Sequence, residues 1–383
     1  MVELAAASQD LRTVIERASR GLVQRDVAVQ LVVLAAVARE HLLLIGPPGT
    51  AKSEAVRRVA AGIGGRYFEY LVGRFTEPAE IFGPVDLQRL RQGVVETQTA
   101  GMLPEADVAF LDEVFLGSTA ILNTLLGVLN ERVFRRGQTQ LDCPLRVCVG
   151  ASNTLPNDPA LAAFSDRFLL HLFLEPIADP HLETLLEAGW SLSDAPASAT
   201  DAEGSLQSLD TLIQASRAID IHAVRGSLAE AIRVLRGEGI EMSDRRVVKL
   251  QRLIAAAAVL DGRTVAHEGD LWPVIFAIPR PGDQDRARDL LRALLDRSTN
   301  ETLPGAAENA SLGPLVRAQR LVSAGQALLE TDPGDDATAR RRLRLELEGV
   351  GREIDAGFAP DALPEGLGPL RQRIVTKTAE LSD

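Results

Sequence analysis

The chain has 383 residues, enough for about two or three domains that each bury a core. Hydrophobic residues make up 46% and charged residues 25%, which excludes disordered and fibrous classes. A net charge of −12 makes nucleic acid an improbable partner, because a phosphate backbone would be repelled. No apolar run reaches the ~18 residues of a membrane span, and the start of the chain does not look like a secretory signal. We therefore expect a cytoplasmic protein.

Short apolar runs alternate with helical segments in the first half of the chain. Strands are predicted at residues 42–45, 67–72, 108–111, 147–150 and 169–174, and helices at 25–39 and 53–61. This alternation predicts an α/β domain over residues 1–178, an αβα sandwich with a parallel sheet. Two excursions from it, at about 85–102 and about 133–141, read as hairpins.

The second half shows only helical periodicity. Residues 179–204 are rich in small and acidic residues and are predicted to be a linker. Four helices, at 213–221, 228–235, 247–260 and 271–278, predict an all-α lid over residues 205–282. Residues 283–383 carry arginine–glutamate helices separated by Pro and Gly, which indicates a C-terminal helical bundle.

The most informative motif follows the first predicted strand. It reads GPPGTAKS and comprises Gly46, Pro47, Pro48, Gly49, Thr50, Ala51, Lys52 and Ser53. It departs from G-x-x-x-x-G-K-[ST] only in Ala51. Inward backbone N–H groups, a helix N-terminus, an ammonium and a hydroxyl suit the phosphates of a nucleotide and a magnesium ion. We expect a cradle for nucleotide phosphates and Mg²⁺; the loop alone does not say which nucleotide.

Two later segments add chemistry to this loop. Asp112 and Glu113 end a buried strand, where Asp112 and Ser53 would hold magnesium and Glu113 would polarise the attacking water. Asn153 follows the next strand and could bind that water or the terminal phosphate. The alternatives are a helix cap for the acids and a loop cap for Asn153.

Two arginines are candidates for contacts with the phosphates. Arg167 precedes the fifth strand and could reach a neighbouring subunit's site. The alternative is an intramolecular salt bridge, between Asp166 and Arg167 or a similar pair. Arg245 lies in the first turn of a lid helix and is placed to reach the phosphates. Arg246 is the other candidate for that role, and a solvated arginine is the third interpretation.

The order of these motifs resembles the AAA+ ATPases. More narrowly, the segments FTEPAEIFGPVDLQRL, AGMLPEADVAFLDEVF, ILNTLLGVLNERVFRRG, ASNTLP and SDRF resemble the MoxR family, especially its RavA-like branch. The resemblance covers about residues 11–278. Arg74-Phe75-Thr76 departs from it, and the chain beyond residue 283 is too short for the large inserted β-rich domain of that branch.

The resemblance implies roles for the motifs. Lys52 and Ser53 belong to Walker A, Asp112 and Glu113 to Walker B, Asn153 is sensor 1, Arg167 the arginine finger and Arg245 sensor 2. Leu22 and Val23 match the segment near the adenine. The excursion at 85–102 becomes the helix-2 insert, and that at 133–141 the hairpin before sensor 1.

The resemblance also implies a function. We expect an ATP-hydrolysing, chaperone-like remodeller that forms a ring, a hexamer by resemblance, and acts on a protein client with a partner bearing a von Willebrand factor A domain. One alternative is a scaffold that binds ATP to assemble but hydrolyses it negligibly. A nucleic-acid translocase is the third hypothesis, supported only by Arg132, Arg135 and Arg136 beside the second hairpin.

Overall fold

The core of the computed structural model is a parallel sheet. The structure describes residues 2–177, 182–192, 202–311, 314–331, 337–357, 363 and 366–381. The strands are β1 (Leu42–Ile45), β2 (Tyr67–Leu71), β3 (Val108–Asp112), β6 (Val147–Ser152) and β7 (Leu170–Phe173). They pair in the order β2-β3-β6-β1-β7. The predicted α/β fold is confirmed, and each strand lies within two residues of its predicted bounds.

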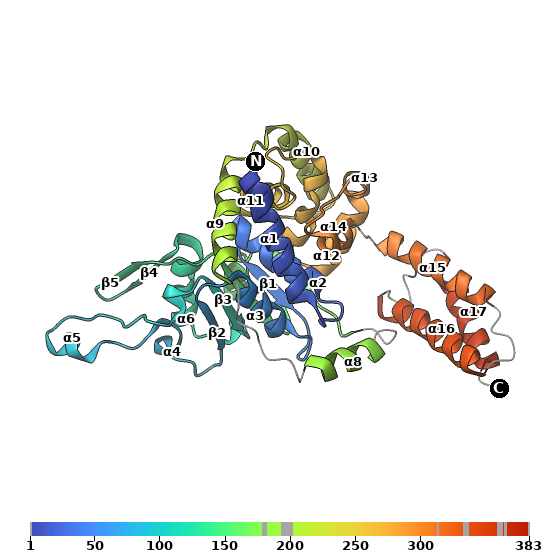
Figure 1. Ribbon diagram of the computed structural model, residues 1–383, viewed down its shortest axis with the longest axis horizontal. Coiled ribbons are helices and arrows are strands. Elements are labelled where there is room, and N and C mark those ends of the chain that lie inside the picture. The colour runs from blue at the N-terminus through green and yellow to red at the C-terminus, as the bar shows by residue number, and fades with distance from the viewer. Residues whose placement is uncertain are drawn as a thin grey trace. The chain divides into compact units, whose positions relative to one another are not determined.

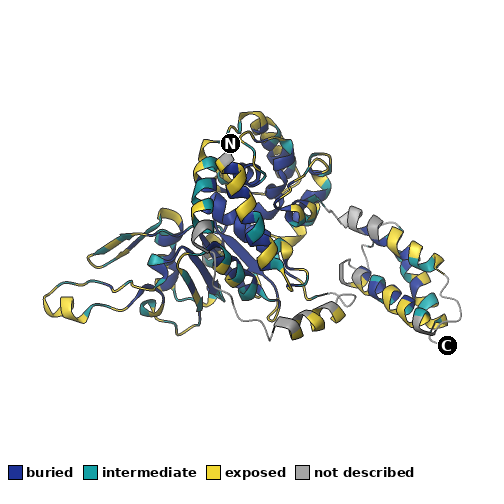
Figure 2. Ribbon diagram, viewed as in Figure 1, coloured by how far each residue is buried: buried dark blue, intermediate teal, exposed yellow. Residues whose placement is uncertain are grey.

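Helices cover both faces of this sheet (Figure 1). Leu42 and Leu44 pack in a cluster with α1 (Val2–Ser19), α2 (Asp26–Ala38), α3 (Lys52–Ile63) and α9 (Ala202–Ala218). Leu43 and Ile45 point to the other face and pack with α4 (Pro78–Phe82) and α6 (Thr119–Leu126). Successive strand side chains alternate between faces, so a strand that is apolar throughout fits only a sheet covered twice. Figure 2 shows the sheet as buried.

The two excursions extend from the sheet and contact each other. β4 (Val133–Arg136) and β5 (Thr139–Asp142) pair antiparallel, as predicted. The excursion at 85–102 is not a two-stranded hairpin: it has one bridge, Val85 to Thr97, and the short helix α5 (Leu87–Arg91). The Asp86 side chain accepts from the amides of Gln88 and Arg89, which favours a helical turn there.

The lid follows the predicted helical pattern with one correction. Its helices are α9, α10 (Arg225–Gly237), α11 (Asp244–Leu260), α12 (Pro281–Leu290), α13 (Arg292–Leu295) and α14 (Pro304–Ser311). The helix predicted at 271–278 is instead a buried 3-10 segment, Trp272–Ala277. Every residue of this segment is apolar and buried, so the sequence shows no alternation between apolar and polar positions. Without that alternation, an α-helix cannot be distinguished from a 3-10 helix.

By contacts between Cα atoms the chain divides into two units. The first comprises residues 1–176 and 196–311, and the second residues 177–195 and 312–383. The first unit therefore holds the α/β core together with helices that continue to residue 311, past the predicted lid boundary at residue 282. Part of the range predicted as linker is helical, as α8 (Leu182–Leu192), while residues 193–201 lie outside the described residues.

The second unit contains α15 (Pro314–Glu330), α16 (Ala337–Gly357) and α17 (Leu367–Glu380). These three helices pack around a small apolar cluster that includes Leu321, Leu347 and Leu370. In the parts of the chain that the structure describes, no helix is both long and apolar enough to cross a membrane.

Candidate functional site

The phosphate loop follows β1 at the carboxyl edge of the sheet, and close packing fixes its first residue. Gly46 donates its N–H to the Ser152 carbonyl at 3.1 Å. A Cβ on Gly46 would lie 2.4 Å from the carbonyl oxygen of Leu174, so only glycine fits there. Ala51 has a left-handed backbone with φ of 58°, which explains why glycine is usual at this position of the pattern.

Lys52 begins α3 and lies under the loop. Its side chain is buried, and Nζ donates to the carbonyls of Gly46 at 2.7 Å and Pro47 at 3.0 Å. Burial lowers the pKa of the Lys52 ammonium, while the nearby carboxylates of Asp112 and Glu113 raise it. The two acids therefore lie close enough to the lysine to interact with its charge.

The acid pair and the amide meet at the same edge. Asp112 ends β3, and its Oδ1 accepts from the backbone N–H of Glu113 at 3.0 Å. Glu113 has a left-handed φ of 48°, a conformation that is costly for a glutamate and that turns the chain sharply after the strand. Asn153 follows the neighbouring strand β6 and donates from Nδ2 to Oε1 of Glu113 at 2.6 Å. Asn153 is thus in direct contact with Glu113.

Among the other predicted binding residues, Thr50 has a structural hydrogen bond of its own. The Thr50 hydroxyl donates to the Pro47 carbonyl at 2.9 Å, which closes the turn. Leu22 is buried and Val23 is half-buried in the segment between α1 and α2. Ser53, in the first turn of α3, is half-buried.

Arg25, which no sequence motif predicted, holds the phosphate loop in place. This buried arginine donates from Nε to the Thr50 carbonyl at 2.8 Å and from Nη2 to the Glu175 carbonyl at 2.9 Å. It therefore links the start of α2 to the phosphate loop and to the chain after β7. Burial lowers the pKa of its guanidinium. An arginine at a predicted helix start belongs to no motif, so nothing in the sequence distinguished it.

The donor set suits magnesium better than a protein-only metal site. Within the described residues no cluster of three or more His, Cys, Asp or Glu side chains could hold a metal. Mg²⁺ commonly takes one or two protein oxygens and fills its remaining positions with phosphates and water. Asp112, beside Lys52, and the Ser53 hydroxyl next to that lysine fit this requirement.

The structure separates the roles of Asp166, Arg167 and Arg246. Asp166 pairs with Arg246 at 3.1 Å, not with Arg167 as the alternative interpretation proposed. Arg246 is buried and also donates to the carbonyls of Phe168, Leu169 and Ala277. Arg246 thus holds the lid to the start of β7. Its guanidinium N–H groups already donate to protein acceptors and are not available to phosphates. Arg167 is half-buried, and its Nε lacks a hydrogen-bond partner among the described residues.

Arg245 does not reach the phosphate loop of its own chain. It is exposed and lines a pocket with Arg39 and Glu40, which precede β1. The loop follows that strand, so the two ends are separated by about 13 Å of four-residue strand. Arg167 lies toward the same amino edge, because it precedes β7, whose Leu170 pairs with Leu42. The structure therefore does not bring these two arginines to Lys52.

These features define a class of protein. The strand order and the phosphate loop after β1 are those of an AAA+ ATPase, as are the acids at the end of β3, the amide after β6 and the helical lid. The model of the MoxR domain in the MoxR-vWA-beta-propeller ternary systems matches residues 9–216, and that of an AAA lid domain matches residues 218–287. The chain belongs to the MoxR family of AAA+ ATPases.

Individual relatives agree with this assignment. Two uncharacterized proteins of Methanocaldococcus jannaschii are each 34% identical over 263 residues, 68% of this chain and 69% and 68% of theirs. The chaperone MoxR1 of Mycobacterium tuberculosis is 28% identical over 173 residues, 44% of this chain and 45% of its own. A crystal structure of a candidate ATPase from Cytophaga hutchinsonii has a TM-score of 0.62 at 16% identity, covering 78% of this chain and 97% of that one, which supports the fold. The closer likeness to the RavA-like branch stays a prediction.

Proposed function

We propose that this chain hydrolyses Mg-ATP and uses the energy to remodel a protein client, as a ring oligomer with its sites shared between subunits. The observation that carries the proposal is the 2.6 Å hydrogen bond from Asn153 to Glu113, beside the phosphate loop. This contact supports Glu113 as the general base and Asn153 as the polar sensor for the water that attacks the terminal phosphate.

The chain's own residues divide the work of hydrolysis. The loop N–H groups and Lys52 bind and orient the phosphates, and Leu22 and Val23 border the adenine. Glu113 is the general base and takes the proton of the attacking water. Asn153 holds Glu113 in position. Ser53 and Asp112 would hold Mg²⁺, which supplies charge neutralisation at the phosphates when bound.

The positions of the two arginines support a site shared between subunits. Arg167 and Arg245 belong to the amino edge of the sheet and Lys52 to the carboxyl edge. In this proposal, both arginines act on the nucleotide of the neighbouring subunit. An arginine finger supplied in trans contributes ~10³ to 10⁵ in rate where it has been measured.

Exposed apolar side chains support a protein client. Phe75 is 94% exposed in the loop after β2, and Leu87 is 69% exposed on α5 of the excursion. Large apolar side chains on projecting loops are typical of surfaces that bind proteins. The matching model is named for MoxR-vWA-beta-propeller systems, which supports a partner with a von Willebrand factor A domain.

Phosphate release by the purified full chain with Mg-ATP tests the proposal. We expect Glu113→Gln to lower turnover by about 100-fold or more. The matched control is Glu230→Gln, an exposed glutamate on α10, which should leave turnover unchanged. Mixing Lys52→Ala subunits with Arg167→Ala subunits should restore part of the activity. Wild-type turnover no higher than that of Glu113→Gln would refute hydrolysis. The scaffold that binds ATP to assemble would then be the remaining hypothesis.

A further inference from the structure

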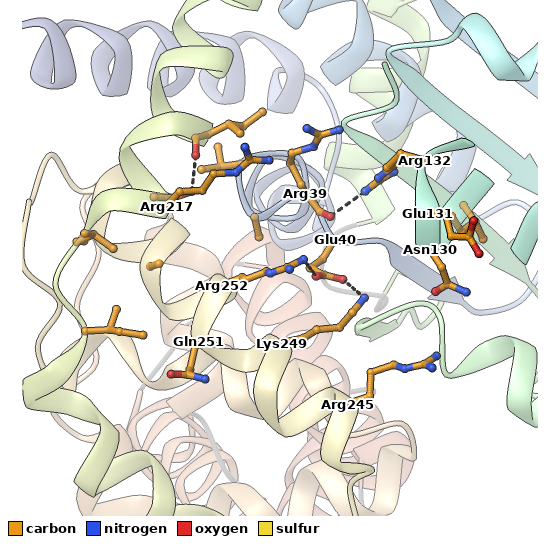
Figure 3. Close-up of a pocket in the computed structure, with 18 of the residues that line it drawn as sticks. Arg39, Glu40, Asn130, Glu131, Arg132, Arg217, Arg245, Lys249, Gln251 and Arg252 are labelled. Carbon is orange, nitrogen blue, oxygen red and sulfur yellow. Dashed lines mark hydrogen bonds and ion pairs between the residues drawn. The ribbon is translucent and has the colours of Figure 1, made fainter. Parts of the chain in front are cut away.

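A large pocket lies at the amino edge of the sheet, away from the phosphate loop. Its volume is about 1180 Å³, and it lies between the core and the lid (Figure 3). The core contributes the end of α2 and the turn that ends at Arg132. The lid contributes the last turn of α9 and the first turns of α11. Pockets for small molecules commonly hold about 300–1000 Å³, so a ligand of considerable size fits here.

The lining is strongly basic in a chain that is acidic overall. Seven lining side chains are basic and three are acidic. Glu40 is buried and already paired with Lys249 at 2.6 Å and Arg252 at 2.9 Å. Glu131 pairs with Arg135, which is not part of the lining. Two of the three carboxylates are therefore committed, and most of the positive charge in the pocket stays uncompensated.

The arginines of the pocket also repel one another. Burial lowers the pKa of Arg39, and the charges of Arg217, Arg146 and Arg252 lower it further, with only Asp210 opposing them. Burial, followed by the charge of Arg39, lowers the pKa of Arg132 to about 10. Like charges held together in a low-dielectric site cost free energy, which a bound anion would offset.

Free donors are available to such an anion. Arg132 is held by hydrogen bonds from Nη2 to the carbonyls of Arg39 at 2.7 Å and Arg146 at 3.5 Å. Its Nη1 is buried without a hydrogen-bond partner in the part of the chain that the structure describes. In that same part, the Arg217 side chain has no hydrogen bond or ion pair, and Figure 3 shows it on the same side of the pocket as Arg39 and Arg132.

We propose that this pocket binds a small anion with two or more phosphate groups, with Arg39, Arg132, Arg217 and Arg252 as its principal contacts. Planar guanidinium groups match phosphate oxygens with two parallel hydrogen bonds. The net charge of −12 favours a small anion over a long nucleic acid, which would bring many charges near the acidic remainder of the surface.

Binding would also connect the core to the lid. Arg39 and Arg132 belong to the core, whereas Arg217 and Arg252 belong to helices of the lid. The pairs of Glu40 with Lys249 and Arg252 already cross this boundary. An anion held by both sides adds contacts that only the folded arrangement makes, so it raises the melting temperature of the protein.

The test uses the full chain with Lys52→Ala, so that the phosphate loop contributes little, and inorganic tripolyphosphate as the probe. Isothermal titration calorimetry without Mg²⁺ should show one binding site for tripolyphosphate per chain. A separate thermal unfolding measurement should show a higher melting temperature when the probe is bound. Adding Arg217→Gln and Arg252→Gln should weaken binding about tenfold or more. The matched control is Arg233→Gln with Arg236→Gln, two exposed arginines of α10 outside the pocket that remove the same charge.

Four results would overturn the proposal. One is the absence of tripolyphosphate binding, and another is equal weakening in the pocket and control variants, which would show only a general attraction between charges. The third is binding only at concentrations where the chain self-associates, which would assign the arginines to a neighbouring subunit. Tighter binding of a single-stranded oligonucleotide than of tripolyphosphate would also reject a small anion. None of these readouts depends on ATP turnover, so the test stands apart from the proposed hydrolysis.

Discussion

The adjacent arginines Arg245 and Arg246 allow a direct test of which one is structural. Arg246 is buried and donates to the Asp166 carboxylate and to four backbone carbonyls. Removing Arg246 leaves buried backbone carbonyls without their donor. Each unsatisfied buried group costs about 1 to 3 kcal/mol, while Asp166 is partly exposed and regains water. We expect Arg246→Ala to lower the free energy of unfolding by about 4 kcal/mol. At about 2 to 4 °C per kcal/mol, this corresponds to a fall of about 10 °C in melting temperature.

Arg245→Ala is the matched control, because the two residues are neighbours on one helix and both changes remove one arginine. Arg245 is exposed, so its loss should change the free energy of unfolding by less than about 0.5 kcal/mol. Differential scanning calorimetry and urea unfolding of the full chain would measure both. Equal melting temperatures for the two variants would refute the assignment of Arg246 as the residue that holds the lid to β7.

Two further predictions concern the loop and the buried histidines. Gly46→Ala places a Cβ 2.4 Å from the Leu174 carbonyl oxygen, so the loop must shift. We expect the affinity for ATP, measured by titration, to fall about tenfold or more. An unchanged affinity would contradict this packing. Burial holds the pKa values of His41 and His171 well below their usual range, so both stay neutral in the folded protein while the unfolded chain takes up protons below about pH 6.5. Stability contributed by the neutral forms is therefore lost as the pH falls, by about 1.4 kcal/mol per histidine at pH 5.5. Urea unfolding at pH 7.5 and 5.5 would measure how much free energy of unfolding is lost between the two. This loss should be about 1.4 kcal/mol smaller for His41→Gln than for wild type. An equal loss would show that His41 does not stay neutral in the folded protein.

Much of the fold could be predicted because each central strand is short and apolar on both faces. Residues 42–45 and 147–150 are buried without exception, and buried strands of this kind stand out from their polar surroundings. The approach of Asp112, Glu113 and Asn153 also follows from a general rule, since carboxyl ends of parallel strands share one edge. The contact between Asn153 and Glu113 is the result of that rule.

Other features depend on packing that no local pattern records. Arg245 and Arg246 are chemically identical neighbours, and only the position of Asp166, 80 residues earlier, decides which one is buried. Arg25 acquires its role from carbonyls at positions 50 and 175. The 3-10 segment Trp272–Ala277 is likewise determined by the packing around it, because apolar residues in a continuous run fit several kinds of buried structure.

The position of the lid bears directly on how the proposed ATPase would be controlled. Arg246 holds the start of α11 to the start of β7, and Glu40 holds the next turns of α11 to the end of α2. These contacts fix the lid to the amino edge of the sheet, whereas Lys52, Glu113 and Asn153 lie at the carboxyl edge. A single chain therefore presents the loop, base and sensor on one edge and Arg167 with Arg245 on the other.

A ring that places the amino edge of one subunit against the carboxyl edge of the next completes every site with groups from two chains. In such a ring, hydrolysis reports on contact between subunits, and the basic pocket beside Arg245 lies where a bound anion can alter that contact.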